Sequence, residues 1–100
     1  MALKIEWTVN ALEDYKQVVD YLLKEWSVKV ATDFINNLEK RVNNLSFFPH
    51  IGIASLKDTS IRSIVITNHN KLYYRVSPGK IEILGIFDTR QNPSKNIYEK

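Results

Sequence analysis

Apolar residues recur every three or four positions through the first half of the chain, which is the spacing of amphipathic helices. A first helix is predicted over about residues 9–25, with Thr8 as its N-cap, and a second begins after Ser27, another capping residue. The short joint between them predicts an antiparallel helical hairpin. The two apolar stripes are Ala11, Tyr15, Val18, Leu22 and Trp26, and then Ala31, Phe34, Ile35, Leu38, Val42 and Leu45.

Apolar and polar residues alternate in four other segments, which predicts β-strands. One lies at residues 3–7, and three follow at residues 61–67, 71–76 and 81–88. Residues 46–60, which contain Pro and Gly, are predicted to form a long loop. The element order predicts an α+β fold: an N-terminal strand and an antiparallel helical hairpin packed on an antiparallel sheet, which a C-terminal three-stranded meander completes.

The four residues Ser77-Pro78-Gly79-Lys80 predict a type II turn between the last two strands. If Ser77 faces Lys80, one face of this hairpin packs on the helices, although a one-residue slip would exchange the faces. The face expected toward the helices carries Leu72, Tyr74, Val76, Ile81, Ile83 and Phe87, with Gly85 leaving room for close approach. The other face carries Lys71, Tyr73, Arg75, Glu82, Leu84 and Ile86.

Length and composition indicate one globular domain over residues 1–100, with 44% hydrophobic and 25% charged residues. The chain has no cysteine, which excludes disulfides, thiolate metal sites and cysteine nucleophiles and is compatible with a reducing cytoplasm. The N-terminus lacks the apolar core of a signal peptide, and no stretch reaches the roughly 18 apolar residues of a membrane span. We therefore expect a cytoplasmic protein that makes no membrane contact.

Positive charge is concentrated in the second half of the chain. Residues 61–100 contain seven Lys or Arg and three acids, whereas residues 1–60 contain seven Lys or Arg and eight acids. A localised positive surface is expected of a protein that meets a polyanion or an acidic protein partner.

Several polar residues have local explanations. Arg75 is predicted to pair with Glu82 across the hairpin. The spacing of Asp88 and Arg90 also allows a local ion pair that would tie the tail to the sheet. Tyr73 can stack on a nucleic-acid base or on a partner's aromatic side chain, but packing with Leu84 is favoured. The two histidines have no second ligand at suitable spacing, and three glycines are too few for a phosphate loop, so neither a metal nor a cofactor is expected.

An ordered set of short motifs spans nearly the whole chain, and with it the sequence resembles the RelE/ParE superfamily of bacterial toxins from type II toxin–antitoxin modules. The motifs are Trp7-Thr-x-x-Ala11, Tyr21, Ala31-x-x-Phe34, Pro49-x-x-Gly52, Ile61-Arg62, Leu72-Tyr73-Tyr74-Arg75-Val76 and the run from Ile83 to Pro93. The resemblance implies a compact toxin that a cognate antitoxin neutralises. It also implies one of two targets, which are DNA gyrase in ParE-like toxins and ribosome-bound mRNA in RelE-like toxins.

In the RNA-cleaving branch, the resemblance places catalytic residues at Arg62, Lys71, Arg90 and Tyr98. Metal-free RNA cleavage needs a base, and Tyr98 would serve only with a strongly lowered pKa. The long helical hairpin and the loop motif Pro49-x-x-Gly52 look more like the ParE branch, and gyrase is therefore slightly favoured. An endoribonuclease and a degenerate member that binds only an antitoxin remain alternatives, which leaves open whether the protein is an enzyme.

Overall fold

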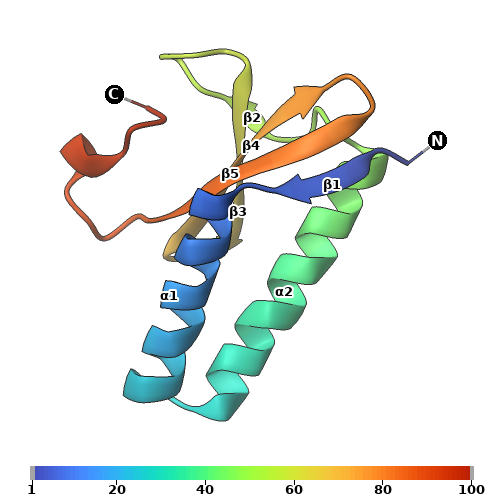
Figure 1. The fold of residues 1–100 in the computed structure, drawn as a ribbon. Coiled ribbons are helices and arrows are strands. Elements are labelled where there is room, and N and C mark those ends of the chain that lie inside the picture. The colour runs from blue at the N-terminus through green and yellow to red at the C-terminus, as the bar shows by residue number, and fades with distance from the viewer. Residues whose placement is uncertain (1, 100) are drawn as a thin grey trace.

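The computed structural model describes residues 2–99, which form two helices packed on a five-stranded sheet (Figure 1). This arrangement confirms the predicted α+β class. The elements are β1 (Lys4–Trp7), α1 (Val9–Glu25), α2 (Val28–Phe47), β2 (Ile53–Ala54), β3 (Ile61–Thr67), β4 (Asn70–Ser77), β5 (Lys80–Asp88) and the short 3-10 helix η1 (Pro93–Lys95).

Side-chain caps start both helices where the sequence predicted them. The Thr8 hydroxyl accepts the N–H of Ala11 at 3.1 Å, and the Ser27 hydroxyl accepts the N–H of Val30 at 3.1 Å. The two helices lie side by side and extend together away from the sheet (Figure 1). Helix α2 ends at Phe47, because Pro49 disfavours a helical residue before it.

The strands follow the order β1-β5-β4-β3-β2, and β1 pairs with β5 in parallel. The other pairs are antiparallel, so the sheet is mixed rather than wholly antiparallel as predicted. The alternation of apolar and polar residues in β1 shows which of its side chains are buried. It does not show whether β1 runs parallel or antiparallel to a strand some 75 residues later. The predicted 46–60 loop also contains β2, a two-residue strand at the opposite edge.

The hairpin of β4 and β5 has the predicted turn and register as far as Tyr74, which pairs with Ile83. Gly79 has φ +76°, as a type II turn requires at that position. The register then shifts by one residue at Leu84, a β-bulge. As a result Ile86 pairs with Leu72 and joins the core.

The same bulge places Phe87 opposite Lys71, on the outer face. The faces predicted for Gly85, Ile86 and Phe87 were therefore wrong, because a bulge reverses the alternation beyond it. The buried core between helices and sheet consists of Ala11, Phe34, Leu38, Val42, Leu45, Ile66, Leu72, Tyr74, Ile81, Ile83 and Ile86.

The motif Pro49-x-x-Gly52 closes over the hydroxyl of Tyr74. This hydroxyl donates to the carbonyl of Pro49 at 2.8 Å and accepts the N–H of Gly52 at 2.9 Å. A Cβ at position 52 would lie 2.6 Å from the Tyr74 oxygen, so the contact requires glycine. The loop is thus fixed by a buried side chain of the central sheet.

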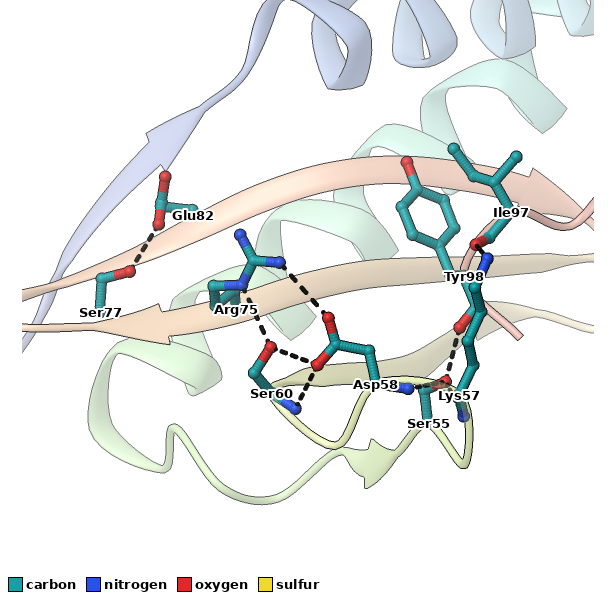
Figure 2. Close-up of polar contacts among 9 residues, drawn as sticks. All are labelled: Ser55, Lys57, Asp58, Ser60, Arg75, Ser77, Glu82, Ile97 and Tyr98. Atoms are coloured by element: carbon teal, nitrogen blue, oxygen red, sulfur yellow. Dashed lines mark hydrogen bonds and ion pairs between the residues drawn. The ribbon is translucent and has the colours of Figure 1, made fainter. Parts of the chain in front are cut away.

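The C-terminal tail lies across the outer face of the sheet. Tyr98 stacks on Tyr73 with ring centroids 4.5 Å apart, which buries Tyr73 completely. The Asn96 amide donates to the Tyr73 hydroxyl at 2.9 Å. Figure 2 shows Ser55 and Lys57 donating to the carbonyls of Tyr98 and Ile97 at 2.5 and 2.9 Å. The predicted cross-strand pairing of Tyr73 with Leu84 was wrong, because Tyr73 lies opposite Gly85 and the ring of Tyr98 stacks on it.

Candidate functional site

Arg90 lies just beyond the end of β5, where a two-pronged ion pair with Asp88 holds it. Its Nε and Nη2 atoms donate to the two carboxylate oxygens at 3.1 and 2.9 Å, and its backbone N–H donates to Oδ1 at 2.9 Å. Hydrogen bonds from the Arg90 side chain hold the pKa of Asp88 below its usual range. The ion pair that the sequence allowed between Asp88 and Arg90 is therefore present, and 49% of the Arg90 side chain remains exposed.

A cleft of about 430 Å³ runs between α1, the end of β5 and the tail. It brings together two of the four sequence-predicted residues, Arg90 and Tyr98. Its other polar lining residues are Asn10, Asp14, Gln17, Tyr21, Asn70, Asp88, Gln91 and Lys95.

Two hydrogen bonds hold the Tyr98 hydroxyl, and one of them requires its proton. Its hydroxyl donates to the Leu84 carbonyl at 3.1 Å and accepts from the Asn10 amide at 3.3 Å. Burial raises the pKa of Tyr98, and the nearby charge of Asp14 raises it further. This direction is opposite to the one that a general base requires.

Lys71 lies on the outer face and has a partner that the sequence pattern did not indicate. Its Nζ is 3.5 Å from a carboxylate oxygen of Glu99 in the tail. The same oxygen accepts the hydroxyl hydrogen of Tyr73 at 2.6 Å. The tail therefore supplies a countercharge as well as an aromatic ring.

Arg62 lies on the helix side of the sheet, because it pairs with Tyr74 and not with a residue of the outer face. Its Nη1 atom donates to the carbonyls of His50 and Gly52 at 3.3 and 2.8 Å. The structure thus separates Arg62 from Lys71 and gives it a part in fixing the loop.

The predicted ion pair between Arg75 and Glu82 was wrong, although the two residues are opposite in register. Arg75 contacts Asp58 and Ser60 from the segment before β3, at 3.8 and 3.4 Å, and Glu82 accepts the Ser77 hydroxyl at 2.5 Å (Figure 2). Sequence spacing fixed the register but could not show that a loop would reach Arg75.

Local acids compensate much of the positive half of the chain. Of the six Lys and Arg between residues 61 and 99, four form ion pairs with described residues: Lys71, Arg75, Lys80 and Arg90. The seventh basic residue, Lys100, lies outside the described residues. The localised positive surface expected from composition is therefore weakened by ion pairs with nearby acids. Within residues 2–99, no group of three potential metal ligands occurs.

Asp14 is a site residue that no motif in the sequence singled out. Its Oδ2 atom accepts the N–H of Ile86 at 2.9 Å, just beyond the bulge. A Cβ at Gly85 would contact the Tyr98 hydroxyl and lie 2.9 Å from Asp14. A glycine in an apolar strand was the only available signal, and it identified a close approach without identifying the partner.

Comparison with known families decides which group of proteins this is. A family model described as the ParE toxin of the type II toxin–antitoxin system parDE matches residues 5–93. The chain belongs to this ParE toxin family. It is therefore a toxin of a type II toxin–antitoxin module, within the superfamily that its motifs indicated.

Solved structures of toxins share the ParE fold. The chromosomal ParDE system from P. aeruginosa aligns with a TM-score of 0.73 and 18% identity, covering 87% of this chain and 96% of that one. The YoeB dimer from Staphylococcus aureus aligns with a TM-score of 0.62 and 22% identity, covering 87% of this chain and 97% of that one. The RelBE2 toxin–antitoxin complex from Mycobacterium tuberculosis aligns with a TM-score of 0.62 and 15% identity, covering 88% of this chain and 99% of that one.

No curated protein matches the sequence of this ParE-family member. Of the helices in residues 2–99, none combines the length and apolar character that crossing a membrane requires.

Proposed function

We propose that this toxin inhibits growth as ParE-like proteins do, by binding and poisoning DNA gyrase, rather than by cleaving mRNA. The observation that carries the proposal is the arrangement of the four residues that an endoribonuclease would use. Arg62 is on the helix side, and Lys71 is paired with Glu99 on the outer face. Arg90 is held by Asp88, and Tyr98 has a raised pKa.

RNA cleavage without a metal requires a base for the 2′-hydroxyl and cations around the phosphate in one place. The two cations nearest the outer face, Lys71 and Arg75, already have carboxylate partners. Binding to a protein target makes no such demand, since it needs a surface and no acid–base pair. The family match over residues 5–93 supports the same choice.

Arg90 is the residue that we propose for target contact. Its guanidinium is half exposed, carries a permanent charge, and is presented in a fixed orientation by Asp88. A guanidinium held in this way can still donate to a carboxylate or a phosphate on a target.

We also propose a cognate antitoxin as the partner that neutralises the toxin. A groove of about 590 Å³ between β1, α1 and α2 offers an apolar surface that an amphipathic helix fits. Its lining residues are Ile5, Trp7, Leu12, Tyr15, Leu38, Glu39, Val42 and Asn43. In this proposal the toxin and its partners meet in the cytoplasm. Failure of the toxin to co-purify with the product of an adjoining small acidic reading frame would count against this partner.

Pulse labelling after induction in a bacterial host tests the target. Early loss of thymidine incorporation with DNA damage, while methionine incorporation continues, is the expected result. Purified gyrase should accumulate cleaved DNA when the toxin is added, and the Arg90→Ala protein should be inactive in the same assay. Early loss of translation with cleaved mRNA would instead identify an endoribonuclease. Normal growth at high soluble expression would indicate a member that only binds antitoxin.

A further inference from the structure

Asp14 is a half-buried carboxylate without a cationic partner in the described part of the chain. Three other carboxylates are half-buried. Asp58 pairs with Arg75 and Asp88 pairs with Arg90, whereas Glu82 accepts the Ser77 hydroxyl on β4 and does not line this cleft. Asp14 has only the backbone N–H of Ile86, which occupies one of its two oxygens.

The carboxylate of Asp14 lines the cleft between α1 and the tail. An ionised carboxylate that is removed from water and left without a cation is unfavourable, and burial accordingly raises the pKa of Asp14. A cation entering the cleft would relieve this cost. The cleft therefore contains one carboxylate, that of Asp14, whose charge no cation of the described residues balances.

The lining indicates which kind of cation fits. Along the cleft, Val18, Leu22 and Ile97 provide apolar surface for an alkyl stem. The amides of Asn10 and Gln17 offer oxygen acceptors, and Tyr21 offers an aromatic face. A planar guanidinium, with five N–H donors and a stacking face, uses all of these features, whereas an ammonium group uses fewer.

The other charges around the cleft do not oppose such a ligand strongly. Asp88 compensates Arg90 within the cleft wall. Lys95 is exposed, so solvent screens its charge. A metal ion is a poor alternative, because no group of three metal-ligating side chains occurs within residues 2–99.

We propose that the cleft between α1 and the C-terminal tail binds an arginine side chain of a protein partner, with Asp14 receiving the guanidinium. Docking at this point would contact α1, the end of β5 and the tail at once, because all three line the cleft. The bound partner would also lie next to Arg90, the residue proposed for target contact.

The test uses the full chain, made by cell-free synthesis with nitrogen-15 label, and two small probes. N-acetyl-arginine amide carries the guanidinium, and N-acetyl-citrulline amide has nearly the same shape without the charge. We expect the arginine probe to shift the amide resonance of Ile86 with a Kd of about 1–10 mM, as for a single charge-assisted contact. The citrulline probe should bind at least about tenfold more weakly.

Matched variants separate Asp14 from general charge effects. Asp14→Asn keeps an oxygen for the Ile86 N–H but loses the charge, so the arginine probe should bind at least about tenfold more weakly. Glu13→Gln removes the exposed neighbouring charge and should leave the Kd unchanged. The comparison of the two probes on the unaltered protein stands even if Asp14→Asn folds poorly.

Several outcomes would overturn the proposal. These are no Ile86 shift at about 50 mM probe, equal binding of citrulline, equal loss in Glu13→Gln, or n-butylammonium binding as tightly as the arginine probe. Neither the probes nor the readout involves toxicity, so the result is independent of whether gyrase is the target.

Discussion

Arg90 and Asp88 form a two-pronged ion pair in which Nε and Nη2 of the guanidinium donate to separate carboxylate oxygens at 3.1 and 2.9 Å. The pair orients the arginine and leaves about half of its side chain in solvent. Exposed ion pairs contribute little to folding stability. The main consequence of the Asp88–Arg90 pair is therefore the fixed orientation of the charged guanidinium.

We expect Arg90→Ala to abolish toxicity and Arg90→Lys to weaken it, because lysine keeps the charge but loses the planar fork. Both variants should stay folded and still bind antitoxin. Growth after induction, thermal unfolding and co-purification with the antitoxin measure the three properties. If Arg90→Ala and Asp88→Ala both lower the melting temperature by many degrees, the ion pair is structural and the functional role of Arg90 is wrong.

Tyr74→Phe should destabilise the protein by about 1–3 kcal/mol, because the Pro49 carbonyl and the Gly52 N–H would lose their partner in a buried site. Denaturant unfolding measures the cost, and hydrogen exchange at Gly52 should become faster. Tyr15→Phe is the matched control, since no hydrogen bond of the Tyr15 hydroxyl is present in the described region. Equal effects of the two substitutions would show that the hydroxyl of Tyr74 does not hold the loop.

Gly85→Ala should displace the tail, because its Cβ would contact the Tyr98 hydroxyl and lie 2.9 Å from Asp14. We expect a loss of about 1–3 kcal/mol in the free energy of unfolding, as for other overpacked sites. Adding Tyr98→Ala removes one of the clashing groups, so the double variant should lose less than the sum of the single losses. Strict additivity would mean that the added methyl does not act on the tail.

Stability should fall as the pH rises from about 10 to about 12, because folding holds the proton on Tyr73. Burial, with the hydrogen bond to Glu99, raises the pKa of Tyr73 to about 12, whereas an unfolded tyrosine ionises near 10. The unfolded chain therefore releases its proton first, and the stabilisation is lost over that interval. Denaturant unfolding at stepped pH checks this, and Tyr73→Phe should flatten the slope; an unchanged slope would contradict the assignment.

Local features of the fold could be predicted from the sequence. The caps at Thr8 and Ser27 and the turn at Gly79 depend on residues within a few positions of one another. The register that this turn sets was also correct as far as Ile83. These interactions depend on short-range geometry that a residue pattern records directly.

The features that could not be predicted depend on partners far away in the chain. The bulge at Leu84 has no local signature, because Gly85 alone does not specify an extra residue. The sequence pattern did not place the residues after Arg90, yet Asn96 is buried against Tyr73, 23 residues earlier. The candidate site changed for the same reason, since the acids that pair with Lys71 and Arg75 come from the tail and a loop.

Strand β1 pairs with β5 alone, and both helices pack on a sheet made mainly of residues beyond 60 (Figure 1). During synthesis, the first half of the chain emerges without the surface on which its apolar stripes must pack. Contacts over such long sequence separations form late, because chain closure costs entropy before they contribute. We therefore expect the nascent toxin to remain unfolded until its final strand has left the ribosome, which gives a co-synthesised antitoxin time to accumulate first.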